Sequence, residues 1–213
     1  MRIRLLLVTA VLTALSLVVA SPASAATVTR SDVVSSLLTV RDLTDGWHKT
    51  DLSGGGGGSD VSGCESASYT SIGVKAKAGR DFQYAQVPTF ITEEVMSFGT
   101  REAARRDFSK GVRQFSACTD FTIDGKTFTI KRLSVGGYAD QVAAFRILGS
   151  VATAAGDVPM SLFLVVTRWG RQQVMVLTTV GGRVTSTVLA SNKRSTVQIS
   201  RAATGNVASM LGR

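Results

Sequence analysis

Residues 160–182 read MSLFLVVTRWGRQQVMVLTTVGG, and this stretch decides the class of fold. Met160 to Thr167 is almost entirely apolar, which is typical of a central strand covered on both faces. Trp169-Gly170-Arg171 then makes a tight return into a second run, residues 173–180. Consecutive strands joined by a short turn form a hairpin, so this stretch predicts an antiparallel sheet.

Segments on the N-terminal side add further strands to this sheet. Residues 121–130 hold two short alternating runs around Asp124-Gly125, a pair that favours a type I′ hairpin turn. Residues 141–153 also alternate, and residues 81–98 are strand-like with an interruption. We therefore predict an antiparallel sheet of about five to six strands.

Helical periods are found at three places in the chain. The clearest helix is expected over residues 100–116, where apolar side chains recur at i, i+4, i+8 and i+11. A short helix capped by Ser31 or Asp32 is expected to run through Leu38, and residues 184–211 are helical at least in their second half. The order of elements predicts one α+β domain, with the sheet packed against helices.

The N-terminus has the pattern of a secretory signal peptide over residues 1–25. Arg2 and Arg4 precede an uncharged stretch, and the small-x-small rule places cleavage between Ala25 and Ala26. The alternative is an uncleaved membrane anchor, but the stretch has sixteen residues where a spanning helix needs about 20. With no cysteine near the cleavage site, a lipid anchor is not expected.

These features divide the chain into a signal peptide (1–25), a short leader (26–30) and one domain (31–213), which we expect to be secreted and extracytoplasmic. The chain has 213 residues, of which 44% are hydrophobic, enough for one packed core. No later segment reaches 18 apolar residues, so no membrane span is expected after signal cleavage.

The chain without its signal peptide is basic. When Arg2 and Arg4 of the signal peptide are left out, 22 basic residues remain against 15 acidic ones, which gives a net charge of +7. That charge suits anionic polymers and headgroups, and no motif for nucleic-acid binding accompanies it.

Cys64 and Cys118 are the only cysteines of the chain. Export places them in an oxidising compartment, which predicts a structural disulfide. A two-thiol metal site or two free thiols are the alternatives. Metal binding would need further ligands, and His48 is the only histidine. We therefore expect no metal site and no cofactor.

The helix expected over residues 100–116 has a local excess of positive charge. Such a face can contact a polyanion, although it is more often simply solvated. The residues of this candidate polyanion contact are Arg101, Arg105, Arg106, Lys110 and Arg113.

The sequence contains little that predicts catalysis. It has neither a Gly-x-Ser-x-Gly elbow in the mature chain nor a His-Glu-x-x-His motif. Glu93 and Glu94 are adjacent on a strand and should point to opposite faces, which makes them poor partners for acid–base work. We name no catalytic residue. Four aromatic residues can stack on sugars or belong to the core: Trp47, Tyr84, Tyr138 and Trp169.

Short motifs give the chain a family resemblance. Leu37-Leu38-Thr39, then Asp42-Leu43 and Gly46-Trp47, look like the opening of the PknH-like extracellular sensor domains of actinobacterial exported proteins. Arg101-Glu102-Ala103-Ala104, the basic helix, Phe115-Ser116-Ala117-Cys118 and the strands that follow are similar to that family in order and spacing. The resemblance covers nearly all of residues 31–211.

The resemblance implies an α+β sandwich with a cleft that binds an unidentified wall-side ligand, small or polymeric, and it implies no enzymatic activity. The chain departs from the family in having one cysteine pair, where members often have two disulfides, and in lacking the tether of membrane-bound relatives. The function expected is therefore a secreted, non-catalytic binding module. The alternatives are a cell-envelope hydrolase that uses carboxylates or His48, and a basic adhesion protein for anionic wall polymers.

Overall fold

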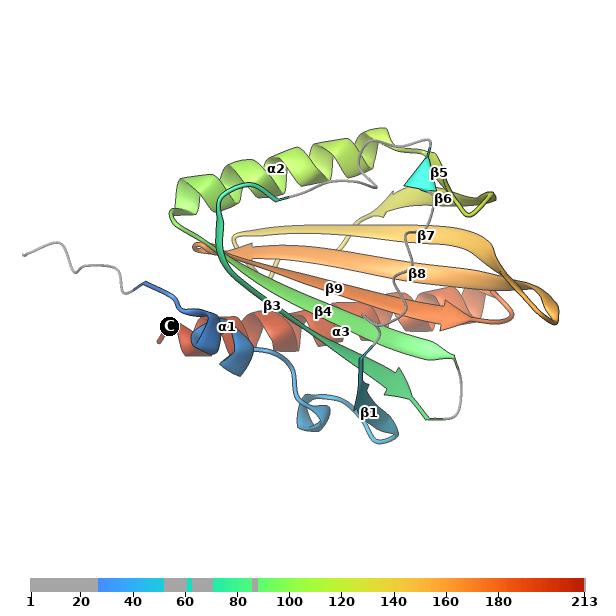
Figure 1. Ribbon diagram of the computed structural model, residues 1–213, viewed down its shortest axis with the longest axis horizontal. Helices are drawn as coiled ribbons and strands as arrows, with labels where there is room; N and C mark the ends of the chain where they lie inside the picture. Colours follow the sequence, from blue (N-terminus) through green and yellow to red (C-terminus); the bar gives the residue numbers. More distant parts are fainter. Residues whose placement is uncertain (1–26, 52–60, 63–70, 86–87, 213) are drawn as a thin grey trace, which may run out of the picture.

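A nine-stranded antiparallel sheet forms the middle layer of the molecule (Figure 1). The computed structural model describes residues 27–51, 61–62, 71–85 and 88–212. In this part of the chain the strand order is β1-β3-β4-β9-β8-β7-β6-β5-β2, and every neighbouring pair is antiparallel. The strands are β1 (Trp47–Thr50), β2 (Val61–Ser62), β3 (Val74–Tyr84), β4 (Thr89–Phe98), β5 (Asp120–Ile123), β6 (Lys126–Leu133), β7 (Gln141–Thr153), β8 (Gly156–Trp169) and β9 (Gln172–Gly181).

The predicted fold class is confirmed, but the predicted number of strands is wrong. β8 lies at the centre of the sheet, and the turns at Gly170 and at Asp124-Gly125 have the positive φ angles that tight hairpins require. The count of five to six strands falls short of the nine in the described chain because residues 81–98, expected as one interrupted strand, belong to both β3 and β4. In addition, β1 and β2 have only four and two residues. Segments this short have too few side chains to show an alternating pattern.

Helices cover both faces of the sheet, and the two faces are covered differently. Figure 1 shows α2 (Arg101–Ala117) above the sheet and α1 (Arg30–Ser35) and α3 (Ser186–Met210) below it. On the α3 face the main core cluster includes Leu38, Val95, Val176 and Val207. α3 approaches β8 and β9 closely along its length, whereas α2 contacts the sheet at fewer places.

The first helix begins earlier and ends earlier than the sequence predicts. Its cap is Thr29 and not Ser31 or Asp32, because the side chains of Thr29 and Asp32 each accept a hydrogen bond from the other's backbone N–H, forming a capping box. The helix ends at Ser35, and the side chain of Ser36 hydrogen-bonds back to the carbonyl of Val33. Thr29 and Arg30, which belong to the expected leader, therefore form the start of this helix.

One edge of the sheet is only partly covered. β1 pairs with residues 81–84 of β3, and in the described chain no strand pairs with the outer side of the rest of β3. The exposed side chains of Lys75 and Lys77 lie along that uncovered part.

Candidate functional site: a cleft between α2 and the sheet

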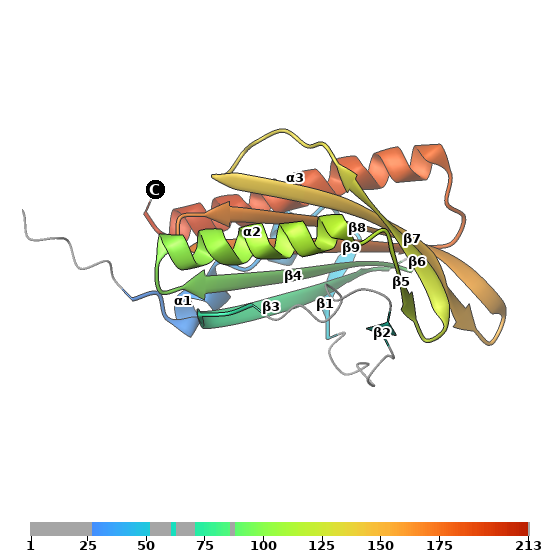
Figure 2. The same ribbon diagram turned by 90° about the horizontal axis from the view of Figure 1, so that it is seen from above.

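α2 is positioned over the sheet by a cap and by one apolar side. Thr100 accepts a hydrogen bond from the backbone of Ala103 at 3.0 Å, which fixes the start of the helix as predicted. Ala104 and Phe108 are buried, and Val112 is half-buried further along the same side. Figure 2 shows that α2 lies lengthwise along the sheet. The predicted helix is confirmed.

A cavity of about 150 Å³ separates α2 from the sheet, and we call it the α2 cleft. Its walls are mostly apolar, with Phe108, Val112 and Phe115 from α2 and Phe145, Leu164, Val166 and Met175 from the sheet. The rings of Phe115 and Phe145 pack against each other, with their centroids 5.2 Å apart. The cleft can therefore take an apolar group.

One end of the α2 cleft is polar. Asp107 is 6% exposed, and its carboxylate accepts hydrogen bonds from Gln173 Nε2, Ser71 Oγ and the backbone N–H of Ile72, each at 3.1 Å. Gln173 Nε2 also donates to the carbonyl of Ala104 at 3.0 Å, which ties α2 to β9. Glu94 lines the same cleft and forms an ion pair of 2.5 Å with Lys77.

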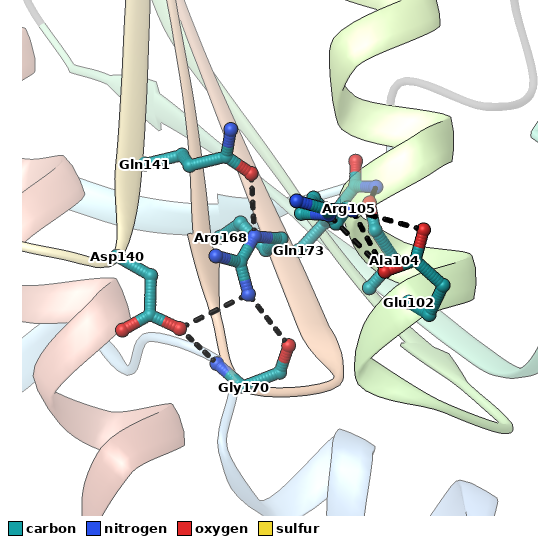
Figure 3. A network of polar contacts seen from close by, with 8 residues as sticks. All are labelled: Glu102, Ala104, Arg105, Asp140, Gln141, Arg168, Gly170 and Gln173. Atoms are coloured by element: carbon teal, nitrogen blue, oxygen red, sulfur yellow. Dashed lines mark hydrogen bonds and ion pairs between the residues drawn. The ribbon is translucent and has the colours of Figure 1, made fainter.

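A buried arginine orders the strand ends near the start of α2 (Figure 3). Arg168 is 9% exposed; its Nε donates to Gln141 at 2.6 Å, and its Nη1 donates to Asp140 Oδ2 and to the carbonyl of Gly170, both at 3.0 Å. Asp140 Oδ2 also accepts from the Gly170 N–H at 2.9 Å. Sequence reasoning missed this network, because Asp140 and Arg168 are far apart in the chain. The only signal was a cation at the end of an apolar strand.

Glu93 and Glu94 point to opposite faces of the sheet, as expected from their adjacency. Glu93 is fully buried on the α3 face, where its Oε2 accepts a hydrogen bond from the Leu38 N–H at 2.8 Å. Its Oε1 is buried and has no hydrogen-bond partner among the described residues. Burial raises the pKa of Glu93 to about 7, against the smaller opposing effects of the Leu38 N–H and the Arg80 guanidinium. No local pattern of residues indicates that Glu93 is buried.

The predicted polyanion contact residues lie together on the outer side of α2. Arg105 pairs with Glu102 at 3.1 Å. The five residues are all exposed: Arg101, Arg105, Arg106, Lys110 and Arg113. Their exposure is what a contact surface needs, and their role stays a prediction.

The predicted disulfide is only half described. Cys118 is 9% exposed at the C-cap of α2, and no cysteine in the described ranges is a free thiol. Cys64 lies outside the described residues, as do Ala25 and Ala26 of the predicted cleavage site, so the bridge and the cleavage stay predictions. His48 is exposed on β1 and does not line the α2 cleft.

Neither a cluster of metal ligands nor a helix of membrane-spanning length and hydropathy is found among the described residues. They contain no group of three or more His, Cys, Asp or Glu side chains that could hold a metal ion. No helix in the same ranges is long and apolar enough to cross a membrane.

The four candidate stacking residues are dispersed. Trp47 and Tyr84 pack edge to face, with ring centroids 5.3 Å apart, at the far edge of the α3 face. Tyr138 donates a hydrogen bond to Ser200 of α3 at 2.8 Å and lies under the guanidinium of Arg201. Trp169 is half-buried at the end of β8. Only Trp47 and Tyr84 therefore form a joint aromatic surface.

Comparison with known proteins supports the fold assignment. No family model and no curated protein matches the sequence. Among solved structures, the chain is similar to the extracellular domain of PknH from Mycobacterium tuberculosis, with a TM-score of 0.54 and 15% identity. The match covers 87% of this chain and 98% of that domain. The resemblance predicted from short motifs is confirmed at the level of structure: this chain shares the fold of the PknH extracellular domain.

Proposed function

We propose that this protein is a non-catalytic, extracytoplasmic binding module of the sensor type, which takes a cell-envelope ligand into the α2 cleft. The main support for this proposal is the cleft, because an apolar cavity with an ordered polar end is typical of small-ligand sites. The shared fold supports the proposal, since the similar structure is by its name an extracellular domain. The predicted signal peptide supports an extracytoplasmic location.

The α2 cleft also limits the ligand. A dry cavity of about 150 Å³ lined by aliphatic and aromatic side chains can hold a benzene-sized molecule. The α2 cleft therefore suits a small ring or the end of a short alkyl chain. Asp107 and Glu94 at the polar end offer oxygen acceptors to a hydroxyl or an amine.

The carboxylates of the α2 cleft are arranged for binding and not for acid–base catalysis. The Asp107 carboxylate accepts three hydrogen bonds, and Glu94 is paired with Lys77. Each carboxylate is therefore held in place by fixed polar partners, as suits a group that orients a ligand. Glu93, whose pKa is raised, is on the opposite face. These observations argue against the hydrolase alternative.

Filling the α2 cleft should abolish binding. We expect benzyl alcohol, 1-hexanol or hexylamine to stabilise the chain from Ala26, by roughly 2.7 kcal/mol at about 100 times the dissociation constant, measured as a thermal shift. Val112→Phe places a ring in the cavity and should remove that shift. Val151→Phe is the matched control, because Val151 is 36% exposed at the end of a strand outside the cleft, and it should respond like the wild type.

Two results would contradict the proposed site. One is that none of the three compounds shifts the melting temperature of the wild type. The other is a Val112→Phe protein that is folded by circular dichroism and is stabilised as much as the wild type.

The outer side of α2 favours a second candidate function, adhesion to anionic polymers. Reversing the charges of Arg105, Arg106 and Lys110 to Glu should then lower the salt concentration that elutes the protein from a heparin column. The matched control reverses three other exposed cations outside α2: Lys131, Arg132 and Arg183. Both triple variants change the net charge equally, so equal elution of the two would show that net charge alone governs retention.

A further inference from the structure

A second pocket lies on the α3 face, where the segment from Val40 to β1 meets the first half of α3. Its volume is about 550 Å³, within the range of small-ligand sites. One wall comes from η1 (Val40–Asp42), β1 and the ends of β3 and β4, and the other from α3. Figure 1 shows α3 on the side of the sheet opposite α2, and β1 at the lower edge of the sheet. We call this pocket the β1–α3 pocket.

The first wall of the β1–α3 pocket is aromatic and is fixed by the backbone. Trp47 and Tyr84 are directly paired in the β1–β3 register, and both rings are partly exposed. Gly46 precedes Trp47 with φ of +95°, and a Cβ at this position would lie 2.6 Å from the Tyr84 ring. Its carbonyl accepts a hydrogen bond from the N–H of Ala85 at 3.0 Å. The two rings are therefore held in place by their own strands.

The second wall is a row of uncharged polar side chains on α3. Their spacing of one, four and seven positions places them on one side of the helix: Ser191, Asn192, Ser195 and Gln198. Ser191, Ser195 and Gln198 are exposed. The Nδ2 of Asn192 is buried and has no hydrogen-bond partner in the described part of the chain. The groups that this wall offers to a ligand are therefore the exposed hydroxyls and the exposed carboxamide.

Charge is nearly absent from the β1–α3 pocket. Among the described residues that line it, Asp42 is the only Asp, Glu, Lys, Arg or His. Its carboxylate accepts hydrogen bonds from the backbone N–H and the hydroxyl of Thr39, at 2.6 and 2.9 Å. The pocket thus offers no cation to an anionic ligand, and its one carboxylate is already engaged.

We propose that the β1–α3 pocket binds a neutral saccharide. The apolar C–H face of a sugar ring would pack on Trp47 and Tyr84, and its hydroxyls would exchange hydrogen bonds with the exposed hydroxyls and carboxamide of α3. This site lies on the opposite face of the sheet from the α2 cleft. It does not depend on the proposed function of that cleft.

Nuclear magnetic resonance can test this site with the chain from Ala26. The probes are maltotriose and the β-1,4-linked trisaccharide of N-acetylglucosamine. The protein has two tryptophans, so Trp169, which does not line the pocket, serves as an internal reference for the indole N–H signal of Trp47. We expect at least one trisaccharide to shift the Trp47 signal in a saturable way and to leave the Trp169 signal in place.

Variants then locate the binding. Ser195→Ala combined with Gln198→Ala removes two exposed polar groups, so the fold should be retained and the dissociation constant should rise at least tenfold, a change of about 1.4 kcal/mol. Ser209→Ala, an exposed serine of α3 outside the pocket, and Val112→Phe in the α2 cleft should bind like the wild type. The proposal is overturned if neither trisaccharide moves the Trp47 signal at about 10 mM. It is also overturned if the double variant binds like the wild type or if Val112→Phe weakens binding.

Discussion

Replacing Cys64 with Ser should lower the free energy of unfolding by about 4 kcal/mol. Cys64 and Cys118 are 54 positions apart, and a bridge that closes so long a loop removes much of the conformational entropy of the unfolded chain. The place of Cys118 in the fold would make the effect of losing the predicted bridge local as well. Cys118 is the C-cap residue of α2, and its backbone N–H donates to the carbonyl of Phe115 at 3.3 Å. Because α2 contacts the sheet at few places, loss of the bridge should also loosen the α2 cleft.

Denaturation with urea can distinguish the loss of the disulfide bond from the loss of side-chain packing at Cys118. Cys64→Ser, Cys118→Ser and the double variant should all lose the same free energy, because each removes the same bond. A reducing agent should lower the stability of the wild type and leave that of the double variant unchanged. A loss confined to Cys118→Ser would mean that only the packing of the buried Cys118 sulfur matters. Unchanged stability of Cys64→Ser would refute the bridge.

The burial of Glu93 should make the stability depend on pH. Its pKa is about 7 in the folded protein, against 4.5 for an ordinary glutamate, so the folded state binds a proton more tightly than the unfolded state. The stabilisation that comes from this tighter proton binding is fully present below pH 4.5 and is lost as the pH rises through 7. We expect the free energy of unfolding to fall by about 3 kcal/mol across that interval from this group alone.

Glu93→Gln should remove most of this dependence. The amide oxygen can still accept the hydrogen bond from the Leu38 N–H, but the side chain no longer carries a proton that pH can remove. Urea denaturation between pH 4.5 and 8 should show that the free energy of unfolding of Glu93→Gln depends less on pH than that of the wild type. Above pH 7 the variant should be more stable than the wild type. Glu94→Gln is the control, since Glu94 is on the other face, and it should keep the slope of the wild type. The same slope in Glu93→Gln would show that Glu93 is not the group responsible.

The sequence predicted the elements whose patterns are local. α2 and the Gly170 hairpin are examples, because the helical period of α2 and the glycine in the turn can be read within a few residues. The predicted start of α1 is wrong because the sequence offers more than one residue that can cap the helix. The capping box of Thr29 with Asp32 satisfies two backbone N–H groups, whereas a cap at Ser31 alone would satisfy one. The start of α1 is therefore decided by residues close to it in the sequence and not by tertiary contacts.

The candidate sites could not be predicted in the same way. The α2 cleft combines Phe108 of one helix with Phe145 and Met175 of separate strands, and its existence depends on how far α2 lies from the sheet. The burial of Glu93 depends on Leu38, which is 55 positions away. A charged residue within a strand is ordinarily exposed, so its burial follows only from the path of the N-terminal segment across the sheet.

The uncovered part of β3 bears on whether copies of the protein associate with one another. A strand with unpaired backbone groups is a template on which another chain can add its own strand, the first step toward aggregates. Lys75 and Lys77 lie along that part of β3, and a copy that paired there would have to bring its backbone against their charges. Positive charge along such a strand discourages the addition of the next chain. We therefore expect these two lysines to act as gatekeepers that disfavour self-association of the folded protein.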